Sequence, residues 1–393
     1  MKPAVIVGFA RTPFGRFLGS LKNVPAVELG GIAIKAALER AGVPKDQVDQ
    51  VLMGMVLQSG AGQIPSRQAT ISAGLPYTVP SDTINKVCAS GLRTVNISHL
   101  LIKTGQASIL VAGGMENMSA SPYILKGIRS GYRMGDAKII DGMVHDGLWC
   151  PFHDVHMGVH GSAVPSEHAI TRQAMDQWAL RSHRLAIEAM DKGFFKEEIV
   201  AVKAPGRSEE FELACCDELP RRDTNLEQLA RLAPAFEKEG LVTAGNAPGI
   251  SDGAAAVVIT SQEKAAELGL EPLAELVASG TVAREPRYIA TVPYEASEMA
   301  LQQAGLKASQ LSLIEVNEAF AGVALTCIKL GGWNPDLVNV NGGAVALGHP
   351  IGASGTRILL TLIAELRRRG GGYGLATICS GAAQGEATII KVP

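Results

Sequence analysis

Short apolar runs recur along the chain and predict buried β-strands. Polar residues do not alternate with apolar ones inside these runs, which is typical of strands in a sheet covered on both faces. Between the runs, apolar residues recur at helical spacing. Because predicted strands and helices alternate, the pattern indicates an α/β fold. The predicted strands span 4–7, 51–57, 109–113, 254–259, 314–317, 338–341, 375–379 and 387–392, and the predicted helices span 26–41, 92–104, 297–304, 319–330 and 356–369.

The second half of the chain repeats the first. Ala-Ser-Gly-Leu-Arg at 89–93 recurs as Ala-Ser-Gly-Thr-Arg at 353–357. Ala-Gly-Gly at 112–114 matches Cys-Ser-Gly at 379–381 at nearly the same offset. Near-equal offsets are hard to obtain by chance, so we predict a duplicated unit in which each copy packs against the other.

A long segment interrupts the first copy only. In the second copy Ser380 is followed closely by Gly385 and a predicted strand, whereas the matching Gly113 lies far ahead of Gly253 and its strand. An insertion of this size on an α/β scaffold usually forms a lid, a ligand-binding subdomain or an oligomer contact. The predicted units are a first half over 1–118 plus 248–268, an inserted loop domain over 119–247, and a second half over 269–393.

Composition places the chain among compact globular proteins. Its 393 residues allow two or three domains, and 47% are hydrophobic against 19% charged. A net charge of −2 gives no electrostatic reason to expect nucleic acid or an anionic membrane as a partner. The apolar start is interpreted as a first strand because Arg11, Pro13 and Arg16 follow it. Six cysteines in such a chain favour reduced thiols, so we expect a cytoplasmic protein.

Cys88 is the first candidate for chemistry. It lies between a predicted extended segment, 81–87, and the predicted helix that follows. Free backbone N–H groups at a helix N-terminus favour a thiolate and lower its pKa. The alternative is an inert buried cysteine. The turn before Ala-Ser-Gly favours a nucleophile.

His349 lies in a loop over 341–355 that contains many glycines and must turn tightly. The duplication predicts that this loop lies beside the Cys88 turn, where the imidazole could take the thiol proton. Cys379 ends a predicted strand, and Asn317 follows another. Taken alone, a cysteine at the end of a strand is more often structural than catalytic, and Asn317 alone is interpreted as a helix N-cap.

Several potential metal ligands lie close together in the predicted insertion: Cys150, His153, Asp154, His156 and His160. A proline and several glycines argue against a regular helix that presents them together. Their spacing matches no standard zinc pattern. The sequence therefore predicts no metal site.

Five motifs of this chain resemble those of the thiolase family, over essentially its whole length. The resemblance implies two similar α/β halves in five layers (αβαβα), with a loop domain inserted in the first. It also implies a homodimer or a dimer-of-dimers tetramer, with 125–142 as the tetramer-forming loop. The motifs are NKVCASGLR at 85–93, GGMENMS at 113–119, NEAFA at 317–321, NGGAVALGHPIGASG at 341–355 and CSG at 379–381.

The same resemblance implies a reversible Claisen condensation of two acetyl-CoA to acetoacetyl-CoA plus CoA. Cys88 would carry the acyl group, and His349 would take its proton. Cys379 would remove the α-proton of the second acetyl-CoA, while His349 and a water held by Asn317 stabilise the enolate. Backbone N–H groups of Cys88 and Gly381 would form the second oxyanion hole.

For coenzyme A, the resemblance points mainly into the insertion. The chain would bind it as substrate and product, without a resident cofactor. Arg221 would pack against the adenine, and the loop containing His156 and Met157 would line the pantetheine tunnel. The expected coenzyme A residues are Leu148, His156, Met157, Arg221, Phe236, Ala319 and Phe320.

Three departures from the family pattern concern the acyl end of the site. Ala382 and Ala383 stand where the family has glycines, and Pro248 replaces a serine. Residues 289–293, Ile-Ala-Thr-Val-Pro, replace a glycine-containing loop. These changes leave open a degradative 3-ketoacyl-CoA thiolase of broader chain length as the alternative.

Two further classes are disfavoured. A ketoacyl synthase of the same fold would have a second histidine where Asn317 stands and no equivalent of Cys379. A non-catalytic scaffold would have no reason to keep the four residues of the reactive motifs, which are Cys88, Asn317, His349 and Cys379.

Overall fold

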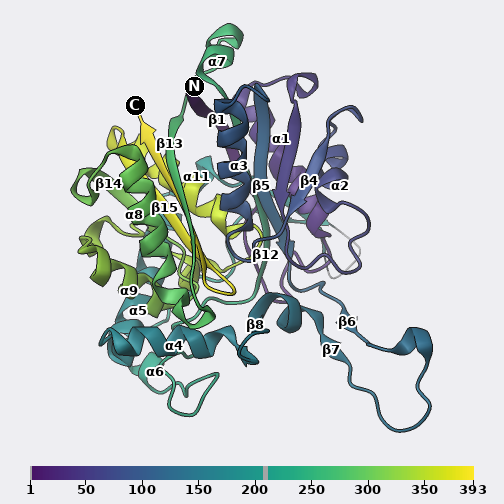
Figure 1. Ribbon diagram of the computed structural model, residues 1–393, viewed down its shortest axis with the longest axis vertical. Helices are drawn as coiled ribbons and strands as arrows, with labels where there is room; N and C mark the ends of the chain where they lie inside the picture. The colour runs from purple at the N-terminus through teal and green to yellow at the C-terminus, as the bar shows by residue number, and fades with distance from the viewer. Residues whose placement is uncertain (1, 207–210) are drawn as a thin grey trace.

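The computed structural model describes residues 2–206 and 211–393 (Figure 1). Residue 1 and residues 207–210, which fall within the first half and the insertion as predicted, lie outside the described residues. One long sheet runs through the molecule in the order β4-β3-β5-β12-β1-β13-β16-β15-β14, with the short β2 beside β12. Its strands are β1 (Ala4–Arg11), β2 (Gly15–Arg16), β3 (Gln50–Gly54), β4 (Ser81–Ile84), β5 (Ile109–Asn117), β12 (Ser251–Ser261), β13 (Ala274–Ala283), β14 (Leu311–Val316), β15 (Gly372–Ser380) and β16 (Gln384–Val392).

The strand pairings repeat in the two halves of the sheet. In the first half β3 is parallel to β5, β5 is antiparallel to β12, and β12 is antiparallel to β1. In the second half β14 is parallel to β15, β15 is antiparallel to β16, and β16 is antiparallel to β13. The two halves join where β1 pairs with β13. The duplication read from the sequence is therefore present in the topology.

One predicted strand is wrong. Residues 338–341 form only an isolated parallel bridge, between Ile314 and Val338, at the place where β4 pairs with β3 in the first half. Asn339 adopts a left-handed conformation with φ of 48°. Its side chain binds the backbone N–H and C=O of Val316 at 2.8 Å each, so it ends the strand by taking the place of ladder hydrogen bonds.

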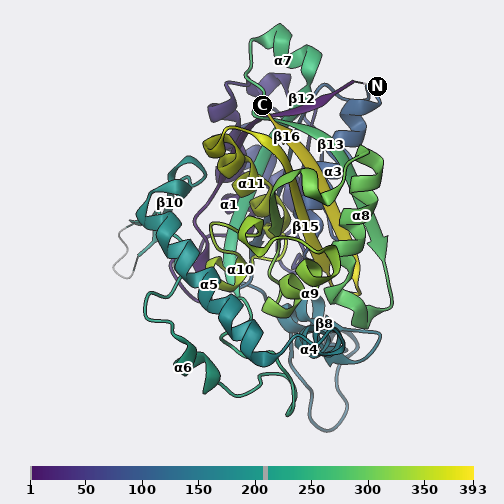
Figure 2. The same cartoon turned by 90° about the vertical axis from the view of Figure 1, so that its left-hand side faces the viewer.

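Helices cover the sheet in layers. The central pair, α3 and α11, contacts strands of both halves, while α1 and α2 cover the first half and α8 and α9 the second (Figures 1 and 2). This arrangement confirms the duplicated α/β fold. The helices are α1 (Ala26–Ala41), α2 (Pro65–Ser72), α3 (Ser90–Lys103), α8 (Val292–Ala304), α9 (Ala321–Gly331) and α11 (Ser354–Arg369). Of the elements named so far, β2, α2 and β13 were not predicted.

Two glycines allow α3 and α11 to approach closely, and they are equivalent in the repeat. A Cβ atom added at Gly91 would lie 2.6 Å from Oγ1 of Thr356, and one added at Gly355 would lie 2.4 Å from the backbone N of Leu92. Each glycine therefore packs against the residue that follows its counterpart. The two repeats meet about this contact, which brings the loops at the start of both helices together.

Between β5 and β12 lies the segment predicted as an insertion, whereas β15 and β16 are joined by residues 381–383 alone. Residues between β6 and β7 extend away from the body (Figure 1). Helices α4 and α5 pack against α9 of the second half. The division into domains stays a prediction. The main elements here are β6 (Tyr123–Ile124), β7 (Ile140–Asp141), β8 (Trp149–Cys150), β9 (Val155–His156), α4 (Met157–Glu167), α5 (Arg172–Asp191), β10 (Val202–Pro205), β11 (Phe211–Ala214) and α6 (Leu226–Ala230).

Candidate active site

Cys88 lies in the turn that joins β4 to α3, as the sequence predicted. The turn is tight: Val87 adopts a φ of 44°, a conformation that β-branched residues rarely take. Two hydrogen bonds of Ser90 hold it, because the Ser90 hydroxyl accepts from Lys86 N–H at 2.8 Å and donates to the Val87 carbonyl at 2.6 Å. The strained turn presents the Cys88 thiol to a cavity between the two repeats.

The electrostatic environment of Cys88 differs from the prediction. Burial raises the pKa of the Cys88 thiol to about 12, although the backbone N–H groups of Gly381 and of Cys88 itself lower it. The sequence-based expectation of a lowered pKa is therefore wrong, because desolvation outweighs the contribution of the helix N-terminus. A thiol of this kind stays protonated at neutral pH and needs a base before it can attack.

His349 supplies an unprotonated ring nitrogen beside this thiol. The Ser354 hydroxyl donates to the carbonyl of Pro350 at 2.9 Å, so it accepts a hydrogen bond from Nδ1–H of His349 at 2.6 Å. Nε2 of His349 then carries the lone pair, and this buried atom has no partner within the described residues. Both His349 and Cys88 line the same cavity.

Burial lowers the pKa of His349 to about 3, with a smaller contribution from Arg357. The imidazole is therefore neutral at every physiological pH and available as a proton acceptor. Its loop is more regular than the sequence suggested. A single helical turn, α10 (Ala344–Leu347), forms between Gly343 and Gly348, and the latter adopts a φ of 97° that suits glycine.

Asn317 directly follows β14, and Cys379 is the penultimate residue of the parallel neighbour β15, so both lie at the carboxyl ends of adjacent strands. The Asn317 N–H donates to the Thr377 carbonyl at 2.9 Å, which fixes the two ends together. Both polar atoms of the Asn317 side chain are fully buried and have no partner in the described chain. An unpaired buried amide is costly, so its position indicates a bound water or substrate atom.

Cys379 is fully buried, and its pKa is raised well above the usual value by desolvation, then by the neighbouring Cys88 and Cys327. Cys379 is therefore close enough to Cys88 to interact with it electrostatically, although Cys379 does not line the cavity that contains Cys88. Next to it, the Ser380 hydroxyl donates to the Lys86 carbonyl at 2.5 Å, which ties the end of β15 to the Cys88 turn. This contact positions the Gly381 N–H at the Cys88 sulfur.

All seven residues expected to bind coenzyme A lie around the cavity that contains Cys88, His349 and Gly381. The cavity has a volume of about 400 Å³ and is mainly apolar. His156 stacks on Phe236, with ring centroids 4.2 Å apart and an interplanar angle of 10°. Their binding roles stay predictions. The seven lining residues are Leu148, His156, Met157, Arg221, Phe236, Ala319 and Phe320.

Two of the three departures from the family pattern lie at this cavity. Pro248 and Ile289 are both lining residues, and the Ile289 side chain is buried. Ala382 and Ala383 adopt φ angles of 60° and 48°, which are left-handed conformations that favour glycine. The β15–β16 turn thus keeps a glycine-like backbone with alanine side chains, at a cost in strain.

Sequence reasoning missed Glu116, which holds the His349 loop from the first repeat. Its carboxylate accepts from N–H groups of Val56 at 3.0 Å, Leu57 at 3.1 Å and Gly352 at 3.1 Å. Burial raises the pKa of Glu116 to about 7, and these three N–H groups oppose the rise. The sequence did contain a signal for this residue, because Glu116 is a charged residue at the end of an otherwise apolar strand, within the motif GGMEN.

Glu318 has the corresponding function from the second repeat, and its role was also missed. It is fully buried. Its carboxylate accepts from Trp178 Nε1 and Ser182 Oγ at 2.8 Å each and from Val345 N–H at 3.0 Å. Helix α5 of the insertion is thereby joined to the loop that contains His349. The motif NEAF gave the residue, although not its partners.

Of the potential metal ligands in the insertion, Cys150, His153 and His160 come together. His156 faces the cavity instead, and Asp154 accepts from Nε1 of Trp149 at 2.9 Å.

Comparison with known proteins identifies the family. The thiolase N-terminal domain matches residues 4–263, and the thiolase C-terminal domain matches residues 270–392. Together the two matches cover nearly the whole chain. The chain therefore belongs to the thiolase family.

Relatives with assigned names are similar over their full length. An acetyl-CoA acetyltransferase of Cupriavidus necator is 50% identical over 391 residues, covering 100% of both chains. An acetyl-CoA acetyltransferase of Pseudomonas aeruginosa is 47% identical, covering 98% of each chain. A probable acetyl-CoA acetyltransferase of Escherichia coli is 46% identical, covering 100% of this chain and 99% of its own.

Proposed function

We propose that this thiolase is an acetyl-CoA acetyltransferase, which condenses two acetyl-CoA to acetoacetyl-CoA and CoA and also catalyses the reverse reaction. Its full-length relatives bear that name. The observation that carries the proposal is the meeting of Cys88, at a strained turn of the first repeat, with the unprotonated Nε2 of His349 from the second.

In the first half-reaction, Nε2 of His349 takes the proton of the Cys88 thiol as the sulfur attacks the thioester carbonyl. The carbonyl oxygen becomes an oxyanion, and the N–H groups of Cys88 and Gly381 stabilise it. Both groups already point at the Cys88 sulfur. Collapse of the intermediate releases CoA thiolate, which takes the proton back from His349 and leaves acetyl-Cys88.

In the second half-reaction, the Cys379 thiol gives its proton to Nε2 of His349, and the resulting thiolate removes a proton from the α-carbon of a second acetyl-CoA. The charge moves to the thioester oxygen, where Nε2–H of His349 and a water held by Asn317 would donate hydrogen bonds. The unpaired amide of Asn317 supports that water. The α-carbon attacks the acetyl group, a new carbon–carbon bond forms, and Cys88 leaves as a thiolate that takes the proton from Nε2 of His349.

The direct test is intact mass spectrometry after incubation with acetyl-CoA. We expect one acetyl group on Cys88, absent in Cys88→Ala, together with formation of acetoacetyl-CoA. The exposed Cys216 offers a matched control, since Cys216→Ser should be acetylated like the wild type. An acetyl group that persists in Cys88→Ala would contradict the assignment of the nucleophile.

We propose short acyl chains as the preferred substrates. The bulky side chains of Ile289 and Phe320 line the same cavity as Cys88, which supports a small acyl pocket. Thiolysis of acetoacetyl-CoA should be faster than thiolysis of 3-ketohexanoyl-CoA. A faster reaction with the longer substrate would favour the broader degradative thiolase instead.

We further propose a homodimer or dimer-of-dimers tetramer in the cytoplasm, with coenzyme A as substrate and product and no resident cofactor. The segment 125–142, which follows β6 and includes β7, exposes Ile128, Met134 and Ile139, which supports a subunit contact (Figure 1). Six free cysteines fit a reducing compartment. None of the helices in the described ranges is long and apolar enough to cross a membrane.

A further inference from the structure

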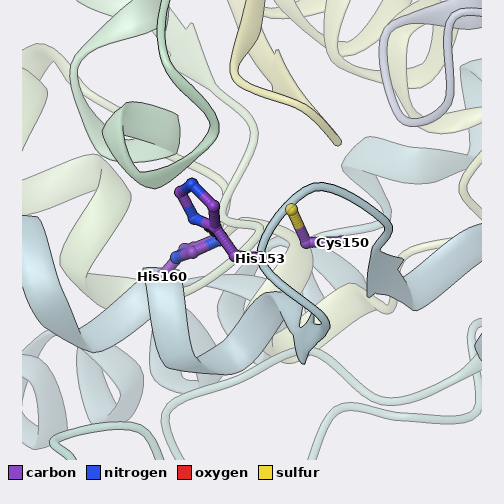
Figure 3. Close-up of side chains that lie close together, drawn as sticks. All are labelled: Cys150, His153 and His160. Carbon is purple, nitrogen blue, oxygen red and sulfur yellow. Dashed lines mark hydrogen bonds between the residues drawn. The ribbon is translucent and has the colours of Figure 1, made fainter.

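Three potential metal ligands converge outside the catalytic cavity. The sulfur of Cys150 and one ring nitrogen each of His153 and His160 all lie within 4.8 Å of one another. Figure 3 shows the rings of His153 and His160 close together, with the Cys150 thiol to one side of them. Cys150 is fully buried and His160 nearly so, whereas His153 closes the group from the solvent side.

The spacing of the two imidazoles suits a tetrahedral ion. Nδ1 of His153 lies 3.3 Å from Nε2 of His160. Two nitrogens at the usual zinc distance of about 2.0–2.1 Å in tetrahedral geometry are about 3.3 Å apart. The two rings are nearly perpendicular, with centroids 5.0 Å apart and an interplanar angle of 80°.

A carboxylate lies behind the exposed ligand. Oε1 of Glu285 accepts from Nε2 of His153 at 3.0 Å. This hydrogen bond places the proton of a neutral His153 on Nε2 and leaves the Nδ1 lone pair on the side of His160. A carboxylate on the outer nitrogen of a histidine is the arrangement that most zinc-binding histidines have, since it fixes the tautomer and orients the ring.

The local fold holds the ligands from two sides. The turn of the β8–β9 hairpin is fixed because Asp154 N–H donates to the Cys150 carbonyl at 3.0 Å and Trp149 Nε1 donates to the Asp154 side chain. Asp154 takes a left-handed φ of 54° to close it. His160 lies one turn into α4, a helix that begins at Met157 despite the glycines and proline in its sequence.

We propose that Cys150, His153 and His160 bind one Zn²⁺ ion, with a fourth position open to water. Binding forms a zinc–thiolate bond and releases the proton of Cys150 to solvent. Sulfur and imidazole ligands favour zinc over magnesium or calcium. This proposal reverses the prediction of no metal site, which considered spacing along one helix and could not include a hairpin folded back on that helix.

The site would join three elements that shape the catalytic cavity. The hairpin and α4 contain His156 and Met157, and Glu285 immediately precedes the 3₁₀ helix Pro286–Ala290, which contains Ile289. All three of these other residues line the cavity, while the zinc ligands do not. The ion therefore has a structural role at the wall of the cavity.

Cobalt provides a spectroscopic test on the full-length protein. After treatment with a chelator, the protein is titrated with Co²⁺, and we expect one equivalent to give tetrahedral d–d bands and a thiolate charge-transfer band. One equivalent of Zn²⁺ should remove both. The charge-transfer band should be absent in Cys150→Ser, and Glu285→Gln should bind Co²⁺ about 10- to 100-fold more weakly.

Two controls make the result specific. Cys216→Ser, which changes an exposed thiol, should keep the spectrum. Cys88→Ser tests whether cobalt binds the catalytic thiols and His349, and a band lost there but retained in Cys150→Ser would overturn the proposal. Absence of stoichiometric Co²⁺ binding to the wild type would also overturn it.

A second measurement does not rely on Cys150→Ser, which changes a fully buried residue and can affect folding. His153 is about one-third exposed, so His153→Gln should fold normally. Zn²⁺ should raise the Tm of the wild type and leave the Tm of His153→Gln unchanged. An equal rise in both proteins would contradict the site.

Discussion

In both repeats the central helix begins with a serine whose hydroxyl donates the same kind of hydrogen bond. The oxygen of that hydroxyl accepts from a different partner in each repeat. Ser90 starts α3 and Ser354 starts α11, and each hydroxyl donates to a carbonyl of the preceding turn. In the first repeat the Ser90 oxygen accepts from the backbone of Lys86, so the serine only shapes the turn. In the second repeat the Ser354 oxygen accepts from His349, so the same hydroxyl sets the tautomer of the catalytic base.

The residue before Ala-Ser-Gly is Cys88 in the first repeat and Gly352 in the second, and the difference has a steric reason. A Cβ atom at Gly352 would lie 2.6 Å from the Met115 carbonyl and 2.9 Å from Oε2 of Glu116, so the second repeat has no room for a side chain there. The equivalent Cys88 faces a cavity. Duplication therefore supplied two matching turns, and the unequal space around them decided which one could become the nucleophile.

The substitution Cys379→Ala should have the largest effect, because it separates the acetylation step at Cys88 from the condensation step. Cys88 of the first repeat should still be acetylated by acetyl-CoA at nearly the wild-type rate. Condensation should fall by about 10²- to 10⁴-fold, the usual contribution of a general base. Quenched mass spectrometry measures the first step and acetoacetyl-CoA formation the second. Normal condensation in this variant would refute the role of Cys379.

Substituting the two equivalent serines tests the comparison directly. Ser354→Ala removes the acceptor that orients His349, and we expect kcat to fall by about 10- to 100-fold because the imidazole is misplaced. Ser90→Ala should mainly lower the free energy of unfolding, by about 1–2 kcal/mol, with a smaller effect on kcat. Steady-state kinetics and urea unfolding of both variants provide the measurement, and equal effects on kcat would argue against distinct roles.

The pH dependence of acetylation tests the neutral imidazole. Since burial lowers the pKa of His349 to about 3, the base stays unprotonated as the pH falls from 7.5 to 5.5. The acetylation rate of Cys88 should change less than about threefold, whereas a base with an ordinary pKa near 6.5 would lose about tenfold. Circular dichroism checks that the fold persists at both pH values. A midpoint near 6.5 would contradict the environment described for His349.

The smallest expected effect concerns the alanines that replace glycines in the second repeat. Ala382→Gly relieves a left-handed conformation at φ of 60°, so the free energy of unfolding should rise by about 1 kcal/mol or less. Ala266→Gly on the exposed face of α7 (Gln262–Leu268) is the matched control and should lower stability by about 1 kcal/mol. Destabilisation by both substitutions would show that Ala382 is not strained.

Local patterns predicted much of the fold. Helix α1 has the predicted bounds, and most predicted strands lie within observed ones. The exceptions depend on tertiary contacts: β13 forms because β1 and β16 flank it, and residues 338–341 fail to form a strand because Asn339 bonds to Val316. Such competition between neighbours cannot be read from apolar periodicity.

The sequence by itself determined the duplication, the interruption of its first copy and the residues of the reactive motifs, because each is written in short stretches of adjacent residues. The tertiary structure decided the protonation of Cys88, the tautomer of His349 and the grouping of Cys150 with His160. Burial and hydrogen bonding set those properties, and the groups responsible lie in segments far apart in the chain. Desolvation in particular depends on everything packed around a group, which explains why the predicted direction of the Cys88 pKa was wrong although its position was right.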